Sequence, residues 1–152
     1  LIECEQTDKD LGLVGSPSKI NPYVISTLIE NDTIPVIAPL GYGPGGETFN
    51  INADTAAGAI SAALKADRLL LLTDVSGVKN SNDEVITELS AQQIRDMIKD
   101  GTISDGMIPK TETALYALDG GVRAVVILDG RVPNACLLEL FTEHGAGSLI
   151  RN

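Results

Sequence analysis

The sequence predicts an α/β fold with a mainly parallel sheet, and two patterns carry this prediction. Leu69–Leu72 and Ala124–Leu128 are apolar runs without alternation, which is typical of strands buried on both faces of a parallel sheet. Helix-start signals, such as Asn21-Pro22, stand between the strand-like segments. Because strands and helices alternate along the chain, we expect right-handed crossovers and a three-layer α/β/α arrangement.

The first part of the chain is expected to hold a short hairpin, a helix and a strand. Glycines around 10–15 favour the hairpin. The helix should begin at Pro22 with Asn21 as its cap and run to about Glu30. Ile34–Ala38 is predicted as a short buried strand, and the Gly/Pro-rich stretch 40–46 as a loop.

The next segments continue the alternation. Asp54 is predicted to cap a helix over 55–65, and a strand should follow over 68–72. Ser90 and Gln93 form a capping box that opens a helix over 91–99, which Gly101 ends.

The last part of the chain should hold a helix followed by two strands. The helix follows Pro109 with Leu115 and Leu118 on one face, and it stops at Gly120-Gly121. The strands are expected over 124–128 and 147–150.

Composition restricts the function. The 152 residues carry 11 Lys+Arg and 21 Asp+Glu, a formal net charge of −10, with 43% hydrophobic residues and 3% aromatic residues. An acidic chain lacks the positive surface that nucleic acids require, and the apolar runs are too short to cross a bilayer. Cys4 and Cys136 stand far apart without a second thiol or histidine at metal-ligand spacing, so we expect no metal site and a reducing, cytoplasmic environment.

A glycine pattern, Gly41-Tyr-Gly43-Pro-Gly-Gly46, fits the dinucleotide-binding fingerprint and follows a predicted strand. That fingerprint should open a helix at once, whereas the next plausible cap, Asp54, lies eight residues after Gly46. We therefore interpret 40–46 as a surface loop.

Polar residues follow a predicted buried strand at Thr73, Asp74 and Gly77. Doubly wound sheets bind ligands at the carboxyl ends of their strands, so this turn is a candidate ligand loop. The alternative is an ordinary turn in which Asp74 bonds its own backbone and Gly77 supplies a positive φ.

Asn50, Asn52 and Asp54 alternate along an extended segment before a helix of small residues. Alternate side chains point to one side of such a segment. Amides can bind a carboxylate, and Asp54 can orient a lysine. The alternative is a polar turn that ends in a helix cap.

The segment from Thr102 to Lys110 places a lysine just after Pro109 at a predicted helix start. A cation is slightly disfavoured there by the helix dipole, so an arriving anion would explain its position. The lysine, the dipole and free backbone N–H groups would form a phosphate cradle. The alternative is a surface lysine that happens to follow a proline. These three candidate sites predict a nucleotide-binding or phosphoryl-transfer domain.

Four blocks of sequence, taken together and in order, resemble the N-acetylglutamate kinases of the amino-acid kinase family, whose fold is carbamate kinase-like. The blocks cover nearly the whole chain and correspond to the C-terminal part of those enzymes: Phe49–Ala57, Leu70–Gly77, Asp100–Lys110, and Ile127–Arg131 with Leu137–Thr142. The resemblance implies one ATP-binding C-terminal domain over 1–152, with the first residues completing the substrate side.

The resemblance also implies the activity and the site residues. The reaction would be ATP-dependent phosphorylation of the γ-carboxylate of N-acetyl-L-glutamate in arginine biosynthesis, with Mg²⁺ carried by the nucleotide. Lys110 and Asp54 would be catalytic, and Asn50 and Asn52 would bind the acid. The residues that would border ATP are Thr73, Asp74, Val75, Ser76, Gly77, Val78, Lys79, Thr102, Ile103, Ser104, Gly106 and Met107.

Other parts of the family's site have no counterpart here. The chain opens at Leu1, and we expect a missing N-terminal half that holds a second lysine, a glycine-rich loop and a substrate arginine. The fragment alone should be inactive, and the intact enzyme should be a cytoplasmic homo-oligomer.

The resemblance leaves regulation and two alternative functions open. Glu139 and Gly145 match positions that contact an arginine effector in some members, although Val126 replaces a histidine found there. We expect His144 to be a solvated turn residue. The alternatives are another amino-acid kinase, acting on glutamate, aspartate or an aminoadipate derivative, and a non-catalytic nucleotide- or effector-binding module.

Overall fold

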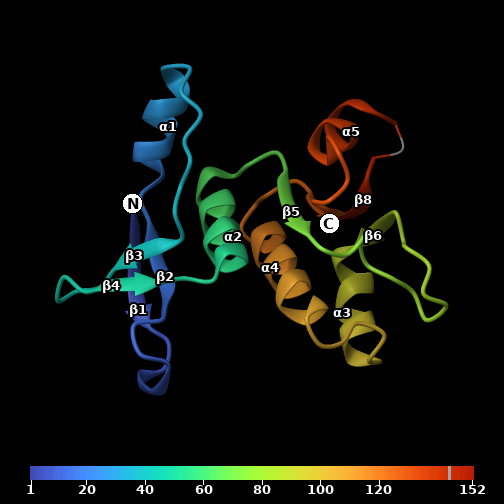
Figure 1. Ribbon diagram of the computed structural model, residues 1–152, viewed down its shortest axis with the longest axis horizontal. Helices are drawn as coiled ribbons and strands as arrows, with labels where there is room; N and C mark the ends of the chain where they lie inside the picture. The colour runs from blue at the N-terminus through green and yellow to red at the C-terminus, as the bar shows by residue number, and fades with distance from the viewer. Residues whose placement is uncertain (144) are drawn as a thin grey trace. The chain divides into compact units, whose positions relative to one another are not determined.

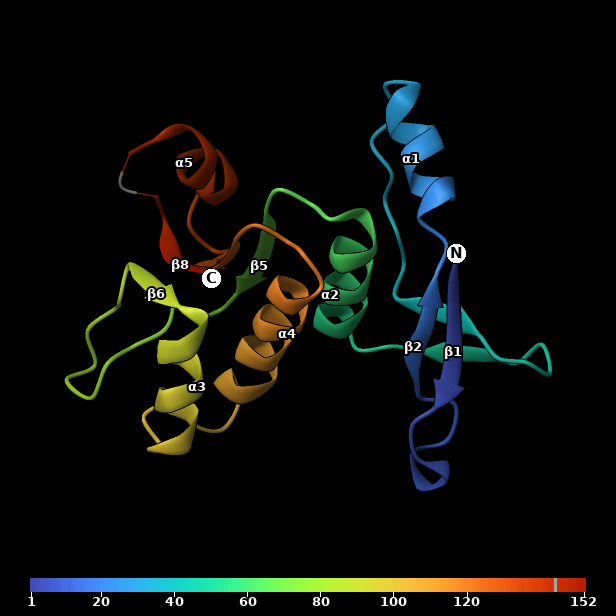
Figure 2. The ribbon, with the colours of Figure 1, turned by 180° about the vertical axis from the view of Figure 1, so that it is seen from behind.

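The computed structural model describes residues 1–143 and 145–152; the prediction for His144 lies outside the described residues. The chain divides into two compact units, an N-terminal unit, Leu1–Leu64, and a C-terminal unit, Lys65–Asn152. Figures 1 and 2 show the elements of each unit from opposite sides.

The N-terminal unit contains a mixed sheet and two helices. The strands are β1 (Ile2–Gln6), β2 (Gly15–Ile20), β3 (Leu40–Tyr42) and β4 (Thr48–Asn50), in the spatial order β2-β1-β3-β4. β1 pairs antiparallel with β2 and parallel with β3, and β3 pairs antiparallel with β4. The helices are α1 (Pro22–Glu30) and α2 (Ala53–Leu64).

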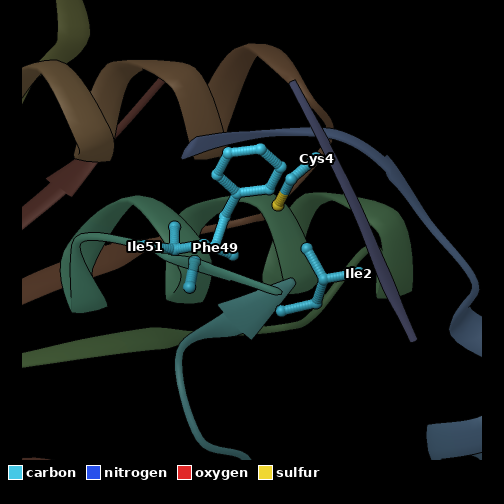
Figure 3. Packing of buried hydrophobic residues seen from close by; sticks show 5 residues of the cluster. Ile2, Cys4, Phe49 and Ile51 are labelled. Atoms are coloured by element: carbon cyan, nitrogen blue, oxygen red, sulfur yellow. The ribbon is translucent and has the colours of Figure 1, made fainter. Parts of the chain in front are cut away.

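The core of this unit lies between the sheet and α2. Ile2 and Cys4 from β1 pack with Phe49 and Ile51 from the β4 segment, as Figure 3 shows, and Ala56 of α2 completes the cluster. Burial raises the pKa of the Cys4 thiol, because the thiolate is poorly solvated there. Small residues on α2 let its backbone approach the sheet closely.

Three predictions for the N-terminal unit need correction. The segment 10–15 is not a hairpin by itself: it is the end of the loop and the first residue of β2 in the antiparallel β1–β2 hairpin, and that loop contains a short 3-10 helix, η1 (Lys9–Leu11). The glycine-rich stretch begins with β3 rather than being a loop throughout, and it leads into the antiparallel partner β4. It therefore opens no helix, which agrees with our rejection of the dinucleotide fingerprint.

The predicted buried strand Ile34–Ala38 is also wrong. No regular element is assigned to it among the described residues, and the Ile34 and Val36 side chains are 89% and 97% exposed. Pro35 has no N–H to donate and Pro39 follows the segment, so both prolines limit its pairing.

The C-terminal unit is a mixed sheet with helices on both faces. Its strands, in the spatial order β5-β7-β8-β6, are β5 (Leu69–Thr73), β7 (Val125–Asp129), β8 (Gly147–Arg151) and β6 (Glu88–Ser90). The pairs β5·β7 and β6·β8 are parallel, whereas β7·β8 is antiparallel. Figures 1 and 2 show α5 (Ala135–Phe141) on the opposite side of this sheet from α3 (Ala91–Lys99) and α4 (Met107–Asp119).

The pleat of β7 explains the layers. Val126 and Leu128 pack against Ala135 of α5, so Val125 and Ile127 point to the other face, where α4 contacts β7. All four side chains have no solvent exposure. The predicted α/β class and layers are confirmed, but the strands form two mixed sheets rather than one mainly parallel sheet.

The helix predictions were more accurate than the strand predictions. The Asn21 side chain accepts the N–H of Tyr23, and Ser90 and Gln93 make both bonds of the capping box. Gly101, with φ +82°, follows the end of α3 as expected. β5 lies at one end of the strand order, and Leu72 is half exposed, so the expectation that this strand is buried on both faces is wrong at that residue.

Candidate functional site

A cavity of about 280 Å³ in the C-terminal unit gathers residues from two loops that are separate in sequence. One loop follows β5, and the other precedes α4. The sequence analysis placed most of the lining residues beside ATP: Val75, Gly77, Lys79, Thr102, Ile103, Ser104 and Met107, with Asn80 and Asp83 in addition. The predicted residues Thr73, Asp74, Ser76, Val78 and Gly106 are not part of this lining.

The loop after β5 is anchored at both ends. At its start, the Thr73 carbonyl accepts the N–H of Gly130, which follows β7, at 2.8 Å, and the Thr73 hydroxyl lies 3.3 Å from a carboxylate oxygen of Asp74. Further along, the completely buried Val78 fixes the loop to the core, so its side chain points away from solvent. Lys79 then forms a 2.8 Å ion pair with Asp83. The cavity therefore has a charged, partly neutralised wall.

The opposite wall is the turn between α3 and α4. The Asp100 carboxylate accepts the backbone N–H of Thr102 at 2.9 Å, and hydrogen bonds to Thr102 hold the pKa of Asp100 below its usual range. Ile103 is buried and its N–H donates to the Met97 carbonyl. These bonds hold Thr102 and Ile103 at the cavity.

The expected cradle of free N–H groups at the start of α4 is not present in this form. α4 begins at Met107, earlier than predicted, and Gly106 gives no side-chain cap. The N–H groups of Met107 and Ile108 donate to the carbonyls of Ser104 and Asp105, and the third helical residue, Pro109, has none. Lys110 lies in the first turn of α4 and is half-buried, so the positive charge of this turn is its ammonium rather than a set of free N–H groups.

The predicted acid-binding residues lie in the N-terminal unit. Asn50 and Asn52 are exposed on either side of the buried Ile51, as the alternation predicted. Asn52 Oδ1 accepts the N–H of Thr55 at 3.1 Å, so Asn52, rather than Asp54, caps α2. Asp54 lies half-buried in the first turn of α2.

A second cavity in the C-terminal unit, of about 360 Å³, includes the two residues assigned to an arginine effector, Glu139 and Gly145. The Glu139 side chain is only 7% exposed; one oxygen lies 3.5 Å from Arg68 Nη1, and the other accepts the N–H of Ala146 at 2.9 Å. Thr142 and Gly147 also line this cavity. The carboxylate is therefore held on both sides.

Sequence reasoning missed two features of these cavities and one ion pair outside their linings. Asn80 and Asp83 stand in a polar turn that composition alone marks as a loop. Arg68 meets Glu139 across 71 positions of sequence, which no local pattern reveals. The Arg131 guanidinium donates two hydrogen bonds to the Asp129 carboxylate at the end of β7. These bonds lower the pKa of Asp129 to about 2.

Over residues 1–143 and 145–152, no group of three or more His, Cys, Asp or Glu residues could hold a metal ion. Within the same residues, we find no helix with the length and hydrophobicity needed to cross a bilayer.

Comparisons with known proteins agree with one another. A model of the amino acid kinase family matches residues 2–129. Acetylglutamate kinase of Ruegeria pomeroyi is 74% identical over 151 residues, covering 99% of this chain and 53% of the relative. The enzyme of Roseobacter denitrificans is 71% identical with the same coverage. The chain thus spans about half the length of these relatives.

Solved structures show the same fold. N-acetylglutamate synthase from Neisseria gonorrhoeae, complexed with coenzyme A and L-arginine, matches 99% of this chain and 36% of its own with a TM-score of 0.90 at 27% identity. Carbamate kinase from Giardia lamblia bound to AMP-PNP matches 91% and 46% with a TM-score of 0.70 at 22% identity. The predicted amino-acid kinase fold, similar to carbamate kinase, is confirmed.

Proposed function

The chain belongs to the amino acid kinase family, and we propose that it is the ATP-binding part of an acetylglutamate kinase. The reaction is transfer of the γ-phosphoryl group of ATP to the γ-carboxylate of N-acetyl-L-glutamate, a step of arginine biosynthesis. The observation that carries the proposal is the 280 Å³ cavity, because two distant loops expected to border ATP form its walls. The name shared by the relatives at 74% and 71% identity supports it.

In this proposal the nucleotide lies against the cavity whose lining includes Val75, Gly77, Lys79, Thr102, Ile103, Ser104 and Met107. Lys110, in the first turn of α4, contacts the transferring phosphoryl group. Asp54 orients the active-site lysines, and Asn50 with Asn52 binds the acid. The Asn52 side-chain oxygen already accepts the cap bond of α2. Its amide NH₂ group can therefore donate to an acceptor on the substrate.

The chemistry needs little more than positioning and charge neutralisation. The γ-carboxylate oxygen attacks the γ-phosphorus in line, the bond to the β-phosphate oxygen breaks, and ADP leaves. A carboxylate nucleophile is already deprotonated, so no general base is required. The Lys110 ammonium offsets the charge on the phosphoryl oxygens. Mg²⁺ would enter with the ATP phosphates, which are its usual ligands together with water and carboxylates.

The proposal extends to the rest of the protein. We propose that residues 1–152 alone do not turn over, because the relatives are about twice as long, and that the intact enzyme is a homo-oligomer. A cytoplasmic location fits the two free thiols, Cys4 and Cys136.

The direct test is calorimetric titration of the 152-residue chain with MgATP. The wild type should bind MgATP. The affinity of Lys110→Ala should be about tenfold lower, because a charge-assisted contact is lost. Lys99→Ala, which removes an exposed lysine of α3, is the matched control and should bind like the wild type. A wild-type chain without affinity for MgATP would exclude the assignment.

Turnover is tested by trapping acyl phosphate with hydroxylamine. The chain alone should give none, whereas turnover near that of a full-length enzyme would contradict the proposed need for further chain. In a full-length form, N-acetyl-L-glutamate should be the preferred acceptor. A preference for L-glutamate, L-aspartate or an aminoadipate derivative would instead favour the alternative amino-acid kinases.

A second candidate function, effector binding without catalysis, rests on the 360 Å³ cavity. It contains the buried Glu139 carboxylate, and the similar synthase structure was solved with L-arginine. If L-arginine binds the chain and Glu139→Gln abolishes binding, while Glu112→Gln on the exposed side of α4 does not, effector binding is supported. Arginine binding without MgATP binding would favour the non-catalytic module.

A further inference from the structure

Ser148 is a buried hydroxyl that neither the proposed reaction nor the effector cavity uses. It is the second residue of β8 and has no solvent exposure. Its Oγ accepts the backbone N–H of Val78 at 2.8 Å and donates to the carbonyl of Ile86 at 2.6 Å. One side chain thus links the two backbone positions, Val78 and Ile86, that flank the seven residues 79–85.

These bonds lie at the base of a hairpin. The Ile86 N–H donates to the Val78 carbonyl at 2.8 Å, and Lys79 forms an isolated antiparallel bridge with Val85. In a regular antiparallel pair the two residues would exchange both N–H···O bonds. Here Val78 and Ile86 exchange one, and the Ser148 hydroxyl stands in place of the other.

The Ser148 hydroxyl also lies at the point where the chain after Ile86 stops pairing within the hairpin and begins to pair with β8. One residue beyond Ile86, the Thr87 carbonyl accepts the N–H of Leu149, and β6 then pairs with β8. On the other leg, Gly77 has φ +147°, and a Cβ at this position would collide with the Ser148 hydroxyl. Glycine is therefore required on both conformational and steric grounds.

The hairpin carries one wall of the nucleotide cavity. Lys79, Asn80 and Asp83 line it from the hairpin, and Gly77 lines it from the leading leg. The Lys79–Asp83 ion pair and the turn bonds made by Asn80 hold the tip together. Because the tip is internally bonded, its place at the cavity is set at the base.

We propose that Ser148 is a positioning residue for the nucleotide: its hydroxyl, inserted between Val78 and Ile86, sets the angle at which the 78–86 hairpin leaves the sheet. This inference rests on the proposed ATP-binding function of the same cavity. Ser148 touches no ligand itself and acts through Gly77 and the hairpin tip.

The test compares nucleotide affinity with stability in the 152-residue chain. In Ser148→Ala the Val78 N–H and the Ile86 carbonyl can bond to each other directly, so the hairpin changes its angle while the melting temperature falls by only about 2–4 °C. MgATP affinity should fall about tenfold. Ser148→Thr keeps the hydroxyl and should restore affinity. Ser61→Ala removes another buried serine hydroxyl, bonded to the Gly58 carbonyl in α2, and should leave MgATP affinity unchanged.

The outcomes separate this inference from the proposed function. If the wild type binds no MgATP, the proposed function fails and this inference fails with it. If the wild type and Ser148→Ala bind MgATP equally, the inference alone is wrong. If the alanine variant does not fold, Ser148→Cys, which fills the site with a much weaker hydrogen-bonding group, replaces it. Wild-type affinity in that variant would equally overturn the inference.

Discussion

Two apolar segments of similar composition, one in each unit, differ completely in solvent exposure. Ile34–Ala38 of the N-terminal unit leaves Ile34 and Val36 almost fully exposed, whereas Val125–Leu128 of the C-terminal unit is completely buried. β7 has β5 and β8 as neighbours and helices on both faces. Ile34–Ala38 pairs with no strand in the part of the chain that the structure describes. An apolar run thus favours burial, but whether it is buried depends on strands and helices from other parts of the chain.

The largest effect should come from truncating matched isoleucines in these two segments. Ile127→Ala removes a completely buried side chain and should lower the free energy of unfolding by about 2–5 kcal/mol, since it leaves a cavity between β7 and its neighbours. Ile34→Ala at an 89% exposed site should change it by less than about 0.5 kcal/mol. Urea unfolding followed by circular dichroism measures both.

A large loss for Ile34→Ala would break the comparison, because it would mean that this side chain is buried in solution. Comparing unfolding midpoints at several protein concentrations separates self-association from burial within one chain. A midpoint that rises with concentration in the wild type and not in Ile34→Ala would show that copies of the chain cover the segment.

The predictability of the fold follows the same division. Helix starts are local, so Asn21 and the Ser90–Gln93 box were read correctly from a few neighbouring residues. Strand pairing is not local. β1 pairs with β2 and β3, and the residues near Ile2–Gln6 do not indicate which strands will be its partners. The prediction of a loop over 40–46 was wrong at β3. Glycines usually mark a loop, but here Gly41 permits close packing against Cys4.

The candidate site shows the same limit. The loops after β5 and before α4 were found because their residue types are unusual at strand and helix ends, and the structure brings them to one cavity. Ser148 and Arg68 were missed because each acts through a residue about 70 positions away. The roles assigned to Asn50, Asp54 and Lys110 remain predictions.

Charge pairs extend the comparison from apolar to ionic groups and should give a smaller effect. Arg68→Ala leaves the buried Glu139 carboxylate with one partner, and we expect a loss of about 1–2 kcal/mol, reduced because Arg68 is itself 37% exposed. Lys19→Ala in the N-terminal unit breaks an exposed 3.3 Å pair with Glu3 and should cost less than about 0.5 kcal/mol. Equal losses in urea unfolding would show that burial does not separate the two pairs.

Helix caps should differ less between the units, since their chemistry is local. Ser90→Ala should cost about 1 kcal/mol, because it removes the Oγ that accepts the Gln93 N–H at 3.1 Å and leaves only the bond from the Ser90 backbone N–H to the Gln93 side chain. Asn21→Ala loses a single 3.2 Å bond to Tyr23 and should cost about 0.5 kcal/mol. Ser90→Thr and Asn21→Asp keep a capping oxygen and should restore most of the stability measured by thermal unfolding. A larger loss for Asn21→Ala than for Ser90→Ala would mean that the capping box gives Ser90 no advantage over the simple cap of Asn21.

The smallest effect concerns the exposed end of the buried strand, and it depends on pH. Asp129, the last residue of β7, accepts the N–H and the guanidinium of Arg131, and these bonds lower its pKa from 3.8 to about 2. A carboxyl group whose pKa is lower in the folded state contributes stability above its ordinary pKa and loses it as the pH falls toward the folded value. The melting temperature of the wild type should therefore fall more steeply between these two pH values than that of Asp129→Asn, which has no proton to bind. Arg131→Ala, which removes the donor and keeps the carboxyl group, should flatten the profile in the same way. A steeper fall in either variant than in the wild type would mean that the bonds between Asp129 and Arg131 do not stabilise the folded state, and that the end of β7 is held by its strand neighbours alone.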